Sequence, residues 1–207
     1  MFDIDGTLTQ SYEFDTECFI SSVKDITGLN INPNWSDYLH VTDTGILNEF
    51  IGSNEIPDKR KIHCKIKDTF IQKIKERIRI EPVSEIPGAS RFIRHLVSMK
   101  GVKVSLATGG WYESALLKLK SAGIDISNIP MASSNDHYSR VEIMKIAASR
   151  ATEGKSLPCT YFGDGSWDKK ACKALGFNFV LIGNKLSHKP NIKNFESINE
   201  ALSCAGL

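Results

Sequence analysis

Residues 159–183, CTYFGDGSWDKKACKALGFNFVLIG, contain two short apolar segments separated by a helical one. The first segment, 159–163, leads directly into an acidic turn at Asp164. Residues 166–175 have the apolar spacing of a short helix that stops at a glycine, and 177–183 form the second apolar segment. A strand, a helix and a strand in this order indicate two parallel strands joined by a crossover helix.

The same alternation begins upstream, at about residue 86. Residues 101–110 (GVKVSLATGG) predict a strand that runs into a polar loop, and residues 128–134 (NIPMASS) predict a short buried strand. Helical patterns follow each of them, at 112–123 and 139–151. The first four residues, MFDI, are few for a further strand, and we leave open whether the native chain extends before Met1. We expect an α/β fold with a Rossmann-like, doubly wound parallel sheet.

Residues 12–84 follow a different pattern, because their apolar positions have helical spacing. Residues 61–80 (KIHCKIKDTFIQKIKERIRI) carry isoleucine or phenylalanine at every fourth position, and residues 16–28 (TECFISSVKDITG) also have one apolar face. The polar and aromatic segment between them ends in another helical pattern. We therefore predict an all-helical cap domain at 12–84, inserted into an α/β core formed by 1–11 and 85–207.

Composition restricts the function classes. The 207 residues are 41% apolar with a net charge of +2, and no apolar run is long enough for a membrane span or a signal peptide. The five cysteines are odd in number and show no metal-ligand spacing, so we expect a reduced, cytoplasmic protein. The oligomeric state stays open between a monomer and a homodimer. The basic stretch 59–79 is interrupted by acidic residues and has the spacing of a packed helix, so we expect no nucleic acid or membrane partner.

Polar residues and a glycine follow the predicted strands, at or shortly after their carboxyl ends. They are Asp3, Asp5, Thr108, Gly109, Arg140, Asp164 and Asp168. Because ligands of open parallel sheets bind at that edge, we expect these residues to converge. Three or four carboxylates in a small space need a hard dication, and oxygen ligands suit Mg²⁺. The threonine, the glycine amides and the arginine offer hydrogen-bond donors to an anion such as phosphate.

Three of these segments resemble motifs of the haloacid dehalogenase superfamily. DIDGTLT is similar to its first motif, VSLATGG to its second and GDGSWD to its fourth, and IPGASRFIRHL resembles the usual approach to the second strand. The order and spacing match over nearly the whole chain. The sequence most resembles the phosphatase branch with an inserted helical cap, which includes proteins like β-phosphoglucomutase and phosphoglycolate phosphatase.

This resemblance implies roles for the acidic residues. Asp3 would be the nucleophile that attacks phosphorus, and Asp5 the acid that protonates the leaving oxygen and then the base that activates water. Mg²⁺ would be held by a carboxylate oxygen of Asp3, the backbone carbonyl of Asp5, and Asp164. Asp168 would bind the metal through water or orient a positively charged neighbour.

The resemblance also implies a phosphate site. Thr108 and Arg140 would hold the phosphoryl oxygens, together with the amide of Gly109. The third motif of the family supplies a lysine or arginine, and both Arg140 and Lys145 lie on the appropriate helix. We favour Arg140 because it is nearer to the start of that helix.

The segment 35–45 of the insert is our candidate for substrate contact. It carries aromatic, imidazole and carboxylate groups, of which we select Trp35, His40, Thr42 and Asp43. Structural alternatives exist for each: Trp35 as cap core, His40 as a packing residue, and Thr42 with Asp43 as the cap of a following helix.

The resulting prediction is a Mg²⁺-dependent phosphomonoester hydrolase of a small soluble phosphorylated metabolite, acting through an aspartyl-phosphate. Asp5 argues against dehalogenase and phosphonatase activity, since those relatives lack an aspartate there. The alternative is a sugar-phosphate mutase of the β-phosphoglucomutase kind, although such mutases use a cap histidine where this chain reads YEFDTE. A non-catalytic binding module is a third hypothesis, which the intact pair Asp3 and Asp5 disfavours.

Overall fold

The computed structural model describes residues 1–207 and contains a parallel sheet of short strands. The strands are β1 (Leu106–Ala107), β2 (Met131–Ala132), β3 (Thr160–Gly163), β4 (Asn178–Ile182) and β5 (Asn191–Ile192). β1 pairs with β2, and β4 pairs with both β3 and β5, all in parallel. Phe2 forms parallel bridges with both Leu106 and Phe162, so the first residues of the chain join the two halves of the sheet. The predicted α/β class is confirmed.

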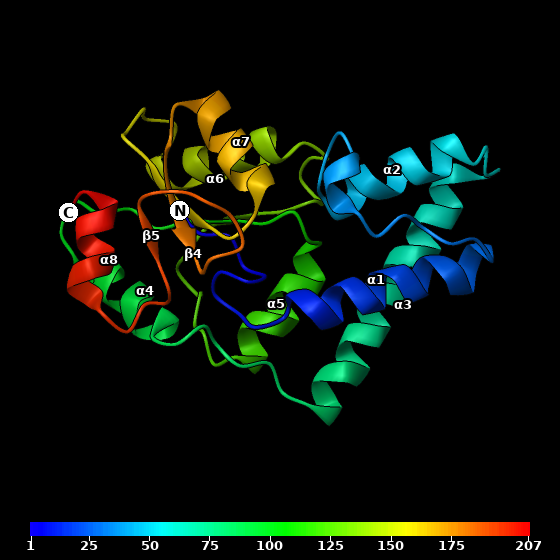
Figure 1. Ribbon diagram of the computed structural model, residues 1–207, viewed down its shortest axis with the longest axis horizontal. Helices are drawn as coiled ribbons and strands as arrows, with labels where there is room; N and C mark the ends of the chain where they lie inside the picture. Colours follow the sequence, from blue (N-terminus) through cyan, green and yellow to red (C-terminus); the bar gives the residue numbers. More distant parts are fainter.

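Helices cover both faces of this sheet, as Figure 1 shows. They are α4 (Ala89–Ser98), α5 (Tyr112–Ser121), α6 (Arg140–Thr152), α7 (Ser166–Leu175) and α8 (Ile198–Ala205). Side chains of α4, α5 and α8 share one apolar cluster with Phe2 and Ile4, whereas those of α6 and α7 share another with Met1. The two clusters lie on opposite faces of the sheet, because successive side chains of a strand point to opposite faces. This is the doubly wound arrangement that the sequence predicts.

Residues 12–84 contain helices and no strand. They form α1 (Tyr12–Thr27), the short 3₁₀ helix η1 (Trp35–Asp37), α2 (Asp43–Ser53) and α3 (Lys59–Ile80), which lie together on the right of Figure 1. The apolar stripe of α3 is packed: Ile66, Phe70 and Ile74 are fully buried. A separate apolar cluster fills the space between these helices. The basic residues of α3 therefore lie on the outer side of a packed helix.

Two features differ from the sequence prediction. Residues 102–105, expected to be part of a strand, lie outside β1, which has only two residues. The C-terminal elements β5 and α8 were not predicted, because their apolar segments are short and interrupted by polar residues. No helix combines the length and the apolar character that crossing a bilayer requires.

Candidate active site

Asp3 and Asp5 lie in the turn that follows the first residues of the sheet. Gly6 has a positive φ of 78°, which lets the backbone turn sharply so that Thr9 N–H bonds back to Ile4 O at 3.0 Å. A Cβ at Gly6 would overlap the carboxylate of Asp164. The glycine therefore allows the turn that carries Asp3 and Asp5 to approach the turn that carries Asp164.

Asp3, Asp164 and Asp168 form a buried acidic cluster at the carboxyl edge of the sheet. Each offers a carboxylate oxygen, and these three oxygens lie within 4.8 Å of one another. Burial, reinforced by the neighbouring Asp168 carboxylate, raises the pKa of Asp3 well above its ordinary value. Burial likewise raises the pKa of Asp164 to about 6, against the attraction of Lys185. Carboxylates held this close are stabilised in their ionised form by a positive charge.

One such charge is Arg140, the first residue of α6. Its Nη1 lies 2.9 Å from Asp168 Oδ1 and 3.6 Å from Asp3 Oδ1. Its Nη2 donates to the carbonyl of Val41 at 3.1 Å, so the guanidinium also contacts the helical insert. Lys145, the other candidate, is exposed and pairs with Glu142 at 2.7 Å. The structure thus places Arg140 beside the acidic cluster and Lys145 on the surface.

Thr108 and Gly109 directly follow β1 on the same edge of the sheet. Thr108 is buried, and its Oγ1 accepts a hydrogen bond from Gly110 N at 3.0 Å. A Cβ at Gly109 would overlap the guanidinium of Arg140. The loop therefore needs glycine at this point, and both residues line the same small cavity as Asp3 and Arg140.

The surroundings of Asp5 contain a residue that the sequence analysis missed. Lys118 on α5 is fully buried and lies 2.6 Å from Asp5 Oδ1 and 2.6 Å from Asp15 Oδ1. The hydroxyl of Ser11 also donates to Asp5. A sequence signal did exist, since Lys118 shares the buried face of α5 with Ser114, Ala115 and Leu119. A lysine on an apolar helix face indicates a buried charge with partners.

The acidic cluster has the properties of a site for a hard divalent cation. Asp164 Oδ1 is buried and has no hydrogen-bond partner, whereas its Oδ2 accepts from Lys185 Nζ at 2.5 Å. Asp168 is already bonded through both oxygens, to Arg140 and to Gly165 N. The carboxylate of Asp5 lies outside the cluster, because Lys118 and Ser11 bind it. Asp3 and Asp164 are therefore the carboxylates that fit direct coordination, and Asp168 fits the orientation of Arg140.

The insert closes this site on its other side. A cavity of about 80 Å³ lies between the core and the insert. The core lines it with Asp3, Asp5, Thr108, Gly109, Gly110, Arg140, Asp164 and Trp167, and the insert lines it with Tyr12, Asp15, Thr16, Phe19, Trp35, Val41, Thr42, Asp43 and Ile46. Of the four selected cap residues, Trp35, Thr42 and Asp43 line the cavity. His40 does not, and its ring packs instead against Tyr138 with centroids 4.9 Å apart.

Several of these cap residues also hold the insert against the core. Thr42 caps α2 by accepting from Gly45 N at 3.0 Å, and its hydroxyl donates to Tyr138 O at 2.6 Å. Asp43 Oδ2 accepts from Trp111 N at 2.8 Å. The structural interpretation of this pair is therefore confirmed, because Thr42 caps α2 and both residues bind the core. Both also line the cavity, and their contact with substrate stays a prediction.

Comparison with known proteins identifies the family. The family model for haloacid dehalogenase-like hydrolases matches residues 1–176. The chain belongs to this family. The predicted membership is thus confirmed, and the chain is a hydrolase of this group. A search among curated proteins found no match.

Solved structures with the same fold include members of this family. CbbY from Rhodobacter sphaeroides, in complex with phosphate, has a TM-score of 0.74 at 14% identity over 100% of this chain and 97% of that one. A hydrolase from Pseudomonas syringae has a TM-score of 0.71 at 20% identity, over 99% and 89% of the two chains. A putative β-phosphoglucomutase from Thermotoga maritima has a TM-score of 0.59 at 18% identity, over 98% and 96%. At these identities the likeness shows the common fold.

Proposed function

We propose that the protein is a Mg²⁺-dependent phosphomonoester hydrolase of small soluble phosphorylated metabolites. The observation that carries this proposal is the group of Asp3, Asp164 and Arg140 at one wall of the small cavity. Two buried carboxylates with an unpartnered oxygen beside a guanidinium suit a metal-bound phosphoryl group. The phosphate found in the CbbY structure supports this class of ligand.

The chain's own residues supply the proposed chemistry. A carboxylate oxygen of Asp3 forms a bond to phosphorus while the ester P–O bond breaks, and Asp5 donates a proton to the departing oxygen. Asp5, then ionised, takes a proton from a water molecule that attacks phosphorus and frees Asp3. When bound, Mg²⁺ would offset the charges of Asp3, Asp164 and the phosphoryl oxygens. Thr108, the Gly109 amide and Arg140 bind these oxygens.

Residues 12–84 are, in this proposal, a cap that must separate from the core for substrate to enter. The cavity of about 80 Å³ holds little more than the transferring group, and the cap contributes much of its lining. Arg140 reaches the cap at Val41, and Trp111 Nε1 donates to Thr44 Oγ1 at 3.0 Å. Closure would exclude water while the phosphoryl group is transferred. The proposal includes a cytoplasmic location. It also includes a monomer or a homodimer, and size-exclusion chromatography with light scattering can test this oligomeric state.

A sugar-phosphate mutase is the second candidate, favoured by the shared fold with the putative β-phosphoglucomutase. Such mutases use a histidine of the cap to assist the leaving oxygen. No histidine lines the cavity here, and Asp15 with its partner Lys118 lies beside Asp5 instead. This arrangement supports the hydrolase.

An aryl phosphate assay tests the proposal. We expect turnover that requires Mg²⁺, and we expect Asp3→Asn to lower it by at least about 10³-fold while leaving the fold intact. Asp68→Asn, at an exposed position of α3, is the control and should retain full turnover. Retained turnover in Asp3→Asn would overturn the assignment of the nucleophile. Phosphate transfer between sugar phosphates with little release of free phosphate would favour the mutase.

A further inference from the structure

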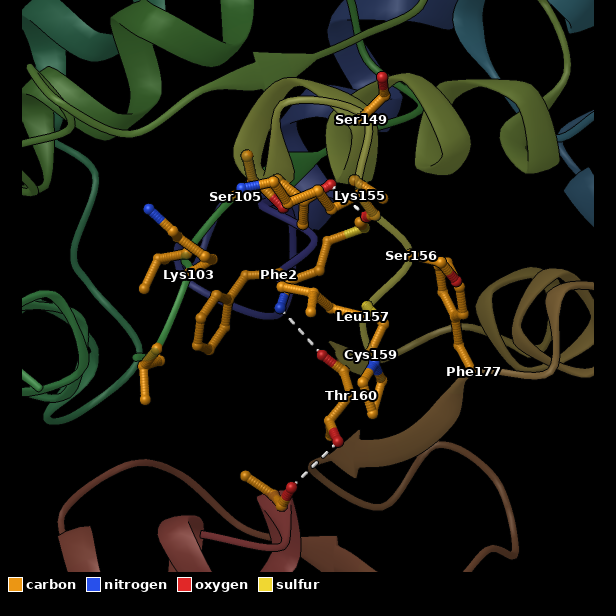
Figure 2. Close-up of a pocket in the computed structure, with 18 of the residues that line it drawn as sticks. Phe2, Lys103, Ser105, Ser149, Lys155, Ser156, Leu157, Cys159, Thr160 and Phe177 are labelled. Carbon is orange, nitrogen blue, oxygen red and sulfur yellow. Dashed lines mark hydrogen bonds between the residues drawn. The ribbon is translucent and has the colours of Figure 1, made fainter. Parts of the chain in front are cut away.

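The proposed catalytic cavity is acidic, although the chain as a whole carries a net charge of +2. Arg140 is the one basic residue in its lining. The carboxylates in its lining are those of Asp3, Asp5, Asp15, Asp43 and Asp164. The cavity in Figure 2, beside residues 102–105 and 157–160, is the opposite case, since Lys103 and Lys155 line it and no aspartate or glutamate does. The acidic character is therefore a local property of the catalytic cavity.

Two of these carboxylates come from the insert and lie beside the proposed general acid Asp5. A Cβ placed on Gly110 would lie 3.7 Å from Asp5 Oδ2 and 3.8 Å from Asp43 Oδ2, so these two carboxylates approach the same point. Asp15 shares the ammonium of Lys118 with Asp5. Because Asp5 is proposed to protonate the leaving oxygen, Asp15 and Asp43 lie where the leaving group of a substrate must bind.

The positive charge near these carboxylates is insufficient for them. Lys118 is the one cation within ion-pair distance of Asp5 or Asp15, and Asp43 forms no ion pair. Burial, reinforced by the charge of Asp15, raises the pKa of Asp43 well above its ordinary value. Burial also raises the pKa of Asp15 to about 6, against the attraction of Lys118. A further positive charge would stabilise the ionised form of both carboxylates.

Each of the two carboxylates has an oxygen left for a ligand. Asp15 uses Oδ1 for Lys118, and Asp43 uses Oδ2 for the N–H of Trp111, so Asp15 Oδ2 and Asp43 Oδ1 remain. No lysine, arginine or histidine of the insert lines the cavity. An anionic leaving group would therefore meet carboxylates and no compensating cation from the insert, which disfavours it.

Aromatic rings line the same cavity, and their faces attract cations. Phe19 lies one turn after Asp15 on α1, and its ring packs edge to face with Trp35 at a centroid distance of 5.9 Å. Tyr12, also in the lining, already holds a cation in this way, since Lys185 Nζ lies 3.7 Å from its ring centroid. Carboxylates combined with aromatic faces are the chemistry that recognises an ammonium group. The cavity volume of about 80 Å³ restricts the leaving group to a few atoms.

We propose that the substrate is the phosphomonoester of a small amino alcohol, whose ammonium binds at Asp15 and Asp43 against the rings of Phe19 and Trp35. The phosphoryl group binds at the other wall, where Asp164 Oδ1 is buried and unpartnered. The ester P–O bond breaks, the amino alcohol leaves with a proton from Asp5, and water completes the hydrolysis to inorganic phosphate. This inference rests on the proposed hydrolase function and specifies its substrate class.

Three phosphomonoesters of two-carbon alcohols test the substrate class, because they differ mainly in charge. They are O-phosphoethanolamine, with an ammonium, 2-hydroxyethyl phosphate, which is neutral at that end, and phosphoglycolate, with a carboxylate. We expect kcat/KM for phosphoethanolamine to exceed that for 2-hydroxyethyl phosphate by at least about tenfold and that for phosphoglycolate by at least about 10²-fold. Phosphate release in the presence of Mg²⁺ measures all three.

The outcomes separate this inference from the proposed function. Turnover of an aryl phosphate together with equal or higher kcat/KM for 2-hydroxyethyl phosphate or phosphoglycolate would overturn the amino alcohol and leave the hydrolase intact. Absence of turnover on every ester, the aryl phosphate included, would overturn the hydrolase and with it this inference.

Substitutions in the insert test the proposed ammonium site. Asp15→Asn and Asp43→Asn each remove one charge and should lower the ratio of kcat/KM for phosphoethanolamine to that for phosphoglycolate at least about tenfold. The ratio compares two substrates on the same enzyme, so a partly unfolded variant still reports it. Asp68→Asn, an exposed carboxylate of the insert outside the cavity, is the control and should leave the ratio unchanged. An unchanged ratio in both cavity variants would overturn the site.

Discussion

The ammonium of Lys118 lies 2.6 Å from Asp5 and 2.6 Å from Asp15, and its side chain is fully removed from solvent. Lys118 comes from α5 of the core, whereas Asp15 comes from α1. One buried cation therefore connects the proposed general acid to the helical insert. Burial opposes the charge on Lys118, but the two carboxylates more than compensate and raise the pKa of this ammonium.

Removal of this cation should destabilise the protein strongly. Lys118→Met leaves Asp5 and Asp15 without their partner, and we expect it to lower the free energy of unfolding by about 3–5 kcal/mol. Lys120→Met, at an exposed position on the same helix, is the matched control and should change it by less than about 0.5 kcal/mol. Urea unfolding of the two variants measures this difference, and similar midpoints for both would contradict the prediction.

Arg140 and Lys145 should differ sharply in their effect on catalysis. Arg140→Ala removes the guanidinium beside Asp3 and should lower kcat/KM by about 10²–10³-fold. Arg140→Lys should recover only part of the loss, because an ammonium lacks the fork geometry that binds two oxygens. Lys145→Ala removes a surface charge paired with Glu142 and should leave kcat/KM unchanged. Steady-state kinetics would refute the assignment if the two alanine variants behaved alike.

Two glycines with similar backbone angles provide a test of the turn below the site. Gly6 and Gly28 have φ values of 78° and 74°, but only a Cβ at Gly6 meets another group, the carboxylate of Asp164. Gly6→Ala and Gly28→Ala should each lower the stability by about 1 kcal/mol or more, since alanine disfavours positive φ. Only Gly6→Ala should also abolish turnover of an aryl phosphate. Full activity of Gly6→Ala would show that the approach to Asp164 is not required.

Stability should respond to pH in opposite ways without and with metal. The pKa of Asp164 rises from 3.8 to about 6 on burial, so in this pH range the folded state binds a proton more tightly than the unfolded state. The stability from this group is therefore fully present below about pH 4 and is lost as the pH rises through about 6. Mg²⁺ requires the ionised carboxylate, so its stabilising effect should appear above about pH 6.

Thermal unfolding with and without Mg²⁺, between about pH 4.5 and 8, measures this dependence. The increase in Tm on adding Mg²⁺ should decline below about pH 6. In Asp164→Asn the increase should be small at every pH, because one ligand charge is gone. An increase in the native protein that stayed constant down to pH 4.5 would contradict the role of Asp164.

The sequence alone determined the fold class and the edge of the sheet that carries the site. Periodicity is a local property, so the alternation of strand and helix from β1 to β4 and the isoleucine stripe of α3 were both predictable. Asp3, Asp164 and Arg140 were predictable as neighbours for a related reason. Each follows or begins an element at the carboxyl edge of a parallel sheet, where the topology brings such positions together.

Only the tertiary structure decided which charges pair. Lys118 reaches Asp5 and Asp15 from positions more than 100 residues away in the chain, and Lys145 turns out to pair with Glu142 on the surface. The tertiary structure also decided that residues 102–105 lie outside β1, although their apolar alternation predicts a strand. Strand formation needs a hydrogen-bonding neighbour, and pairing of charges needs close approach, so both depend on contacts that local sequence does not specify.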